Sequence, residues 1–147
     1  MGADSDDAAG EWLTGEASRC FGCGQDNPHG LRLRFRRIAP DEVVGEYTAP
    51  EHQAGAPGVI HGGVQATLLD EVLGYAAHAV REPGVAVDIV TVEFSLRYRR
   101  PAPTGEPLRL RGRFLRSEGR DVWVAGAIED AQGRVLTEAE ARWRRVG

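Results

Sequence analysis

The chain has 147 residues, of which 41% are hydrophobic and 27% charged, with a formal net charge of -4 at pH 7. These values fit one globular domain of ordinary composition and argue against a nucleic-acid-binding protein. No apolar run approaches the ~20 residues of a membrane-spanning helix and no secretory leader is visible, so we expect a cytoplasmic protein that binds no membrane.

Residues 1–18 are predicted to form a flexible acidic tail. They hold five acidic residues, no basic residue and no hydrophobic periodicity. Within this tail, Trp12 and Leu13 are the residues expected to dock locally. We therefore assign one folded domain to residues 19–147.

A turn-rich segment, CFGCGQDNPHG, follows the tail at residues 20–30. Cys20 and Cys23, followed by His29, raise the question of a zinc site. A structural zinc site usually takes four ligands from two paired clusters, and the chain has no second Cys-x-x-Cys. We therefore expect no metal and favour a packed turn, with a redox-active cysteine pair as the alternative.

Alternating apolar and polar residues predict strands on both sides of one helix. Residues 31–35 and 41–48 are expected to form a hairpin, and the Gly- and Pro-rich residues 50–60 a loop. Four more strands are expected after the helix, at residues 86–99, 108–114, 122–128 and 134–144. Short connections favour antiparallel pairing. One helix cannot cover both faces of such a six-stranded sheet, so the sheet must curl around the helix or pair with another copy.

Residues 62–80 are predicted to form that helix, because the glycine-rich HGG at 61–63 precedes a long apolar stretch. Apolar residues cover most of its circumference. A polar wedge remains, formed by Thr67, Asp70, Glu71, Gly74 and His78. A helix of this kind is largely enclosed, and we expect its wedge to face a cleft or a partner chain.

The helix offers two groups for acyl-transfer chemistry. The first backbone N–H groups of the helix can hold an oxyanion, and the carboxylate of Asp70 can act on water. Eight residues separate Gly62 from Asp70, or about 12 Å along the helix axis at ~1.5 Å per residue. One helix therefore cannot bring both groups to one carbonyl. This distance predicts a homodimer, or a dimer of dimers, in which the two groups come from different chains.

Several motifs together resemble the hotdog-fold acyl-CoA thioesterases, and most closely their phenylacetyl-CoA thioesterase-like (PaaI-type) branch. They are the HGG start, the acid nine residues after His61, the YRRP of the next strand and the opening CFGCGQDNPHGLRLRF. The similarity covers about residues 20–144. It implies an α+β hotdog fold, in which a curved antiparallel β-sheet wraps around one long central helix. It also implies a cofactor-free thioesterase that hydrolyses an acyl-CoA or acyl-carrier thioester.

The resemblance also implies roles for residues at the helix. The N–H of Gly62 would polarise the thioester carbonyl, with His61 shaping the turn and Gly63 contributing to substrate binding. Asp70 would act as general base or as nucleophile, and the residues do not choose between these two roles.

Two further positions follow from the same comparison. Thr91, seven residues before Tyr98, would be the family's Ser or Thr helper, although an ordinary threonine on the polar face of its strand is an equal interpretation. Gly55 stands where many relatives carry Asn. That polar contact is therefore either missing here or supplied to the substrate by Gln53 or His52.

Other polar residues leave alternatives open. Glu71 is the rival carboxylate and suits a substrate or interface contact. Arg99 and Arg100 end a strand beside the expected cleft, where they would meet CoA phosphates or remain solvated. Two other functions stay in view: a non-hydrolytic acyl-thioester binding module, and a hotdog dehydratase or hydratase that uses His61 or His78.

Overall fold

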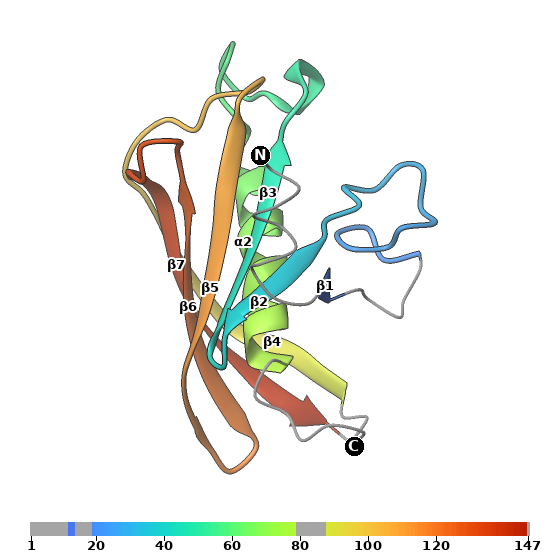
Figure 1. Cartoon of the computed structure of the whole chain (residues 1–147), viewed down its shortest axis with the longest axis vertical. Coiled ribbons are helices and arrows are strands. Elements are labelled where there is room, and N and C mark those ends of the chain that lie inside the picture. The colour runs from blue at the N-terminus through green and yellow to red at the C-terminus, as the bar shows by residue number, and fades with distance from the viewer. Residues whose placement is uncertain (1–11, 14–18, 79–87, 147) are drawn as a thin grey trace.

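The computed structural model describes residues 12–13, 19–78 and 88–146. Within these ranges the elements are β1 (Trp12–Leu13), β2 (Phe35–Ala39), β3 (Glu42–Thr48), the 3-10 helix η1 (Glu51–Gln53), the helix α2 (Gly62–His78), β4 (Asp88–Tyr98), β5 (Pro107–Glu118), β6 (Asp121–Glu129) and β7 (Val135–Val146). The strands form one sheet in the order β1-β2-β3-β5-β6-β7-β4, and every neighbouring pair is antiparallel (Figure 1).

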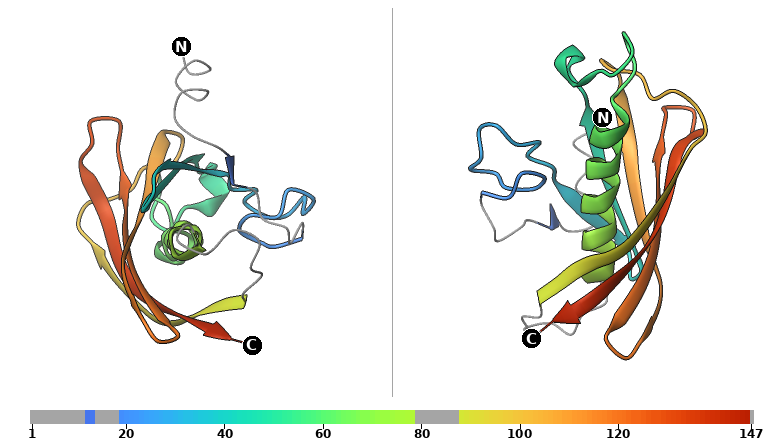
Figure 2. Two further views of the ribbon diagram at one scale, coloured as in Figure 1. Left: turned by 60° about the horizontal axis from the view of Figure 1, so that its bottom comes forward. Right: turned by 180° about the vertical axis from the view of Figure 1, so that it is seen from behind.

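The sheet curves around α2, which lies along its concave face (Figure 2). Buried side chains recur along α2 at spacings of three and four residues, as one face of a helix requires; they are Leu68, Leu69, Val72, Leu73 and Ala76. The strands contribute buried apolar side chains to the same cluster, among them Val43, Leu110, Val124 and Ile128. Burying one such leucine or valine contributes about 1.5–3 kcal/mol. The predicted α+β hotdog architecture is confirmed.

The start of the domain agrees with one expectation and corrects another. Within residues 1–18 the structure describes only residues 12 and 13, which pair with β2 as a short strand, as the local docking expected of these two residues requires. The strand expected at 31–35 begins only at Phe35. Arg32 has a φ of 53°, which breaks an extended strand. The alternating pattern is still satisfied, because Leu33 and Phe35 are both buried.

The polar wedge of α2 differs from expectation at one position. Thr67, Asp70 and Glu71 are half-buried. Gly74 instead faces the sheet, where an added Cβ would lie 2.8 Å from Cη2 of Trp143. The glycine is therefore needed for close helix–sheet packing, and does not line a cleft.

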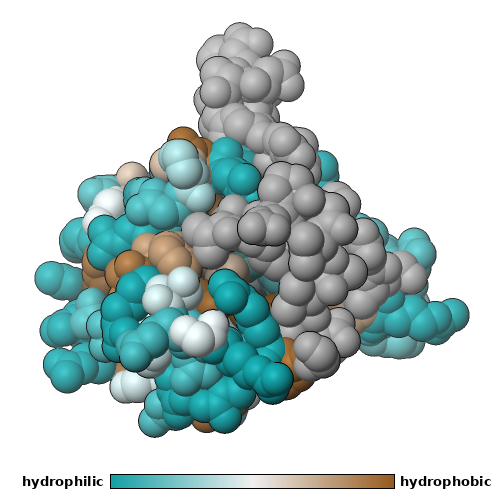
Figure 3. Space-filling model, turned by 90° about the horizontal axis from the view of Figure 1, so that it is seen from below, coloured by the Kyte–Doolittle hydropathy of each residue, from teal (hydrophilic) through white to brown (hydrophobic). Residues whose placement is uncertain are grey.

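No helix within the described residues is both long and apolar enough to cross a membrane. Seen from the end where α2 finishes, the described residues form a largely hydrophilic surface with scattered hydrophobic side chains (Figure 3). β4 forms one edge of the sheet and exposes Val90 and Val92, with 45% and 38% of their surfaces accessible. A long edge strand with exposed apolar side chains is a surface on which another chain can pair.

Candidate active site

A side-chain hydrogen bond joins the middle of α2 to β4. The hydroxyl of Thr91 donates to Oδ1 of Asp70 over 2.9 Å. Both residues are half-buried. Burial raises the pKa of the Asp70 carboxyl, and the hydrogen bond from Thr91 lowers it in part. The result is a carboxylate held in one orientation, in surroundings that make it more basic than an exposed aspartate.

Thr91 faces α2 because of a β-bulge, which the sequence pattern did not reveal. The pairing of β4 with β7 shifts register between Thr91 and Glu93, which leaves Val92 as the extra residue. Thr91 lies opposite Trp143, whose ring packs against α2. Simple alternation put Thr91 on the polar face with Glu93. That assignment is wrong, since the bulge turns Thr91 toward Asp70.

The start of α2 presents unpaired backbone donors. His61 donates its backbone N–H to the carbonyl of Gln53 over 2.9 Å, and its Nδ1 accepts the N–H of Gly63 over 2.9 Å. Gln65 completes the first turn by donating its N–H to the carbonyl of His61. Within the described residues, the N–H groups of Gly62 and Val64 have no hydrogen-bond partner. These free donors stand at the positive end of the helix dipole.

The loop before α2 is fixed by polar contacts on two sides. Tyr47 donates its hydroxyl to Oε1 of Gln53 over 2.9 Å, which orients this half-buried amide beside His61. Tyr98 at the end of β4 donates its hydroxyl to the carbonyl of Gly62 over 2.9 Å. The structure thus brings Gln53, His61 and Gly62 together, while His52 remains exposed.

A buried side-chain amide, that of Gln65, supports the start of α2. It was not identified from the sequence. Gln65 is only 4% exposed, and its Nε2 donates to the carbonyl of Ile60 over 2.8 Å. Its Oε1 accepts the hydroxyl of Thr137 over 2.5 Å. A glutamine inside an otherwise apolar helix stretch is the signal that would have drawn attention to it. Gln65 ties the loop, α2 and β7 together beneath the HGG turn.

Arg99 and Arg100 lie at the same end of the molecule as Gly62, because they directly follow Tyr98. The Arg99 guanidinium forms an exposed ion pair with Glu138 at 2.6 Å, which raises the pKa of Arg99. Arg100 lines a hollow of about 370 Å³. Both backbone N–H groups donate to the carbonyl of Leu136, so the two arginines are held at the strand end.

Glu71 lies in the middle of α2, away from the helix start. Its carboxylate contacts the turn at residues 20–23 of its own chain, with Cys20 Sγ 3.9 Å from Oε1. Burial raises the pKa of Glu71, and the neighbouring Asp70 adds to the increase. Burial also raises the pKa of the Cys23 thiol to about 12. The structure therefore groups Glu71 with the cysteines and leaves the exposed His29 outside this group.

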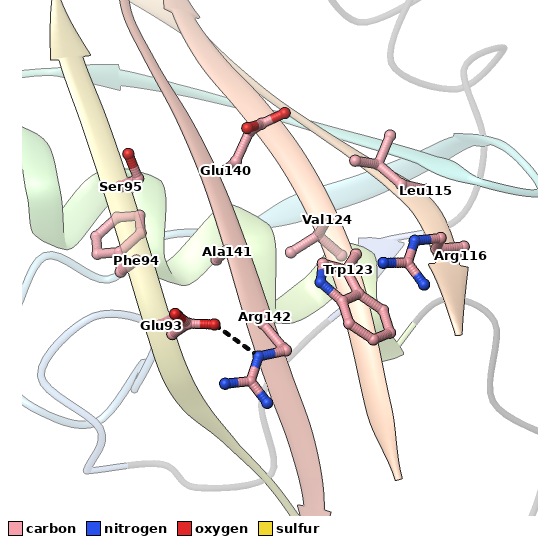
Figure 4. Close-up of a pocket in the computed structure, with 10 residues that line it drawn as sticks. All are labelled: Glu93, Phe94, Ser95, Leu115, Arg116, Trp123, Val124, Glu140, Ala141 and Arg142. Atoms are coloured by element: carbon pink, nitrogen blue, oxygen red, sulfur yellow. Dashed lines mark hydrogen bonds and ion pairs between the residues drawn. The ribbon is translucent and has the colours of Figure 1, made fainter. Parts of the chain in front are cut away.

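A hollow of about 500 Å³ lies on the face of the sheet turned away from α2 (Figure 4). Arg142 crosses its floor and donates to Glu93 over 2.8 Å. Its wall includes Trp123, above which the guanidinium of Arg116 stacks 3.6 Å from the ring centroid. None of the predicted site residues lines it.

Comparisons with known proteins agree with the chemistry that this geometry supports. A family model described as "Thioesterase superfamily" matches residues 57–137. The acyl-coenzyme A thioesterase THEM4 of Mus musculus is 32% identical over 108 residues, which are 73% of this chain and 44% of that protein, so the chain spans less than half of this relative. The crystal structure of RHA08564, a thioesterase superfamily protein, shows 35% identity and a TM-score of 0.75 over 84% of this chain and 61% of that one. A Ralstonia eutropha protein described as phenylacetic acid degradation-related shows 25% identity and a TM-score of 0.69 over 79% and 86% of the two chains.

Proposed function

This chain belongs to the thioesterase superfamily, with the PaaI-like hotdog fold, and on that basis we propose that it hydrolyses acyl-CoA thioesters to a free acid and CoA. The single observation that carries the proposal is the half-buried Asp70 carboxylate, held by Thr91 on the helix that begins with unpaired N–H groups. Acyl-carrier thioesters share the same reacting group and are the alternative substrate class. No cofactor is needed for either hydrolysis.

The proposed reaction uses two groups, the N–H of Gly62 and the carboxylate of Asp70. The thioester carbonyl oxygen binds the N–H of Gly62, where the helix dipole favours the negative charge that develops in the transition state. His61 and Gln53 hold that turn in shape, and Gly63 lies beside the acyl group. Asp70 removes a proton from a water that attacks the carbonyl carbon, or attacks the carbon itself to give a mixed anhydride. Either path expels the CoA thiolate, and on the second path a water then hydrolyses the anhydride to release the free acid and restore Asp70.

Each site is proposed to combine two copies of the chain. Gly62 and Asp70 are two helical turns apart on α2, about 12 Å along the axis. A second copy paired along the exposed edge of β4 would bring its own helix start toward the Asp70–Thr91 pair. The exposure of Val90 and Val92 on that edge supports this arrangement. The protein would therefore act as a homodimer or as a dimer of dimers.

The arginines at the end of β4 are proposed to bind the phosphates of CoA. Arg100 is exposed, and no ion pair to it exists among the described side chains. Arg99 shares its charge with Glu138. Guanidinium groups suit phosphate oxygens through paired hydrogen bonds. Arg100 is therefore expected to contribute more than Arg99.

The test is a hydrolysis panel of aliphatic and aromatic acyl-CoA esters. Wild-type protein should release CoA, and Asp70→Asn should lower the rate by about 10²–10⁴-fold, as expected for loss of a general base. Glu46→Gln, which makes the same charge change at an exposed residue, is the matched control and should retain full activity. Tight binding without turnover would favour a binding module, and an unchanged rate for Asp70→Asn would contradict the proposal.

A further inference from the structure

The turn at residues 20–23 meets the middle of α2 in a cluster that the proposed hydrolysis does not use. We propose that Cys20, Cys23 and Glu71 bind one zinc ion, which joins this turn to the helix. The two sulfur atoms and a carboxylate oxygen all lie within 4.8 Å of one another. Thiolate and carboxylate are both ordinary zinc ligands, and Cys-x-x-Cys is a usual spacing for two of them.

One separation in the cluster is already close to that of two ligands on one zinc ion. Bond lengths of about 2.3 Å to sulfur and 2.1 Å to oxygen place tetrahedral ligands roughly 3.5–3.8 Å apart. Cys20 Sγ and Glu71 Oε1 are 3.9 Å apart, so they need only a small adjustment. Glu71 comes from a site 51 residues along the chain from Cys20. The ligand set is therefore closed by tertiary structure, and for this reason a search for a second Cys-x-x-Cys could not find it.

The backbone of the turn is arranged around the sulfur atoms. Cys23 directs its N–H to Cys20 Sγ at 3.5 Å, and Gly24 donates its N–H to the carbonyl of Cys20 over 2.9 Å. An N–H directed at a metal-bound thiolate stabilises its negative charge. A Cβ added at Gly22 would lie 2.2 Å from the carboxyl carbon of Glu71. Only glycine at this position leaves room for the carboxylate to reach the cysteines.

The surroundings also suit a bound cation. Cys23 is 8% exposed, and Cys20 and Glu71 are half-buried. Tyr75, one turn after Glu71, adjoins Cys23, and its buried hydroxyl has no hydrogen-bond partner in the part of the chain that the structure describes. A water would complete the four ligands of a tetrahedral site. His29, the ligand that the sequence spacing offered, is not part of the cluster.

Metal analysis of the full chain, purified with its thiols reduced, tests the site without reference to enzyme activity. Mass-spectrometric elemental analysis should find one zinc per chain. After replacement of zinc by Co²⁺, a thiolate-to-cobalt charge-transfer absorption should appear in the near ultraviolet. Each of Cys20→Ser, Cys23→Ser and Glu71→Gln should weaken zinc binding by at least ~10-fold in competition with a chromophoric chelator. His29→Gln is the matched control and should bind zinc as the wild type does.

Three results would overturn the zinc assignment. They are a wild-type chain that binds no stoichiometric zinc and shows no thiolate–cobalt band, zinc binding that survives Cys20→Ser unchanged, and isolated protein whose mass shows a Cys20–Cys23 disulfide that excludes the metal. The cobalt spectrum is measured on the wild type. It therefore decides the matter even if a cysteine variant fails to fold, and its outcome is independent of whether the chain hydrolyses thioesters.

Discussion

Thr91 donates its hydroxyl to one carboxylate oxygen of Asp70, and this 2.9 Å contact links the edge strand of the sheet to the central helix. The hydrogen bond fixes the carboxylate through Oδ1. In the reaction we propose, its second oxygen meets the water or the substrate carbon. The hydrogen bond depends on the bulge at Val92, without which Thr91 would face away from α2. This contact therefore leads to predictions about the pKa of Asp70, the rate of hydrolysis and the stability of the fold.

Loss of the Thr91 hydroxyl should move the acidic limb of the pH–rate profile. This limb reports the ionisation of Asp70 in the free enzyme, because a general base or nucleophile acts in its charged form. Burial raises the pKa of Asp70 and the Thr91 hydrogen bond opposes that rise. Thr91→Val removes the opposing contribution, so the acidic limb of kcat/KM should shift to higher pH. Thr91→Ser keeps a hydroxyl and should leave the limb in place; an unshifted limb in Thr91→Val would contradict this.

Asp70→Asn should stabilise the fold at neutral pH while it lowers the rate of hydrolysis. Because burial raises the folded-state pKa of Asp70 above its ordinary value, burying the charged form destabilises the protein at pH values above the folded-state pKa. The penalty fades as pH falls through the folded-state pKa, and it is absent below the unfolded value. Thermal unfolding should therefore give a higher Tm for Asp70→Asn at pH 7 and a smaller difference toward pH 3.5. A Tm difference that grows on acidification would be inconsistent with a buried, destabilised carboxylate.

Arg100→Ala should weaken recognition of CoA without altering the chemistry. An exposed ion pair contributes up to ~1 kcal/mol, so KM for acyl-CoA should rise by about 5-fold with kcat retained. The same acyl group on N-acetylcysteamine, which lacks phosphates, should show no change in KM. Arg109→Ala, at an exposed arginine on β5, is the control. Equal effects on both thioesters would mean that Arg100 does not contact phosphate.

Gly74→Ala should destabilise the domain through the contact with Trp143. An added Cβ would lie 2.8 Å from an atom of this rigid ring, and overpacking of this kind costs about 1–3 kcal/mol. Trp143→Phe removes the distal ring atoms, so the double variant should lose less stability than the two single losses added together. Urea unfolding measures all four proteins. If the losses in unfolding free energy of the two single variants simply add in the double variant, the two residues do not interact.

Periodicity predicted most of the architecture, and local backbone geometry explains where it did not. The single helix and the strands after it follow from apolar spacing, and their order is confirmed. The positive φ of Arg32 delayed the start of β2, and there Leu33 donates its N–H to Gly22 rather than to a strand. The bulge at Val92 reversed the face of Thr91. Neither feature has a signature in hydrophobic alternation.

In the candidate site, too, contacts between residues close in sequence could be predicted, and contacts between distant residues could not. The HGG start and its unpaired donors are local features, so the residues themselves indicate them. The Gln65–Thr137 hydrogen bond spans 72 residues, and the Cys20–Glu71 contact spans 51. Such pairs depend on how the helix packs against the sheet and against the turn at residues 20–23. A single sequence does not indicate this packing.

The central claim is that Gly62 of one subunit and Asp70 of its partner serve the same thioester. Proline is tolerated at the first position of a helix, so Gly62→Pro deletes the N–H while the helix is kept, and Gly62→Ala retains the donor as its control. Gly62→Pro alone should lower kcat by about 10²–10³-fold.

The most direct measurement is the activity of Gly62→Pro mixed with Asp70→Asn, each inactive alone, after subunit exchange at equal amounts. Half of the dimers would then be mixed, and each would hold one site with both groups intact. Activity should therefore return to about a quarter of the wild-type value. If exchange occurs and no activity returns, the two groups do not meet across a subunit interface, and the catalytic account is contradicted.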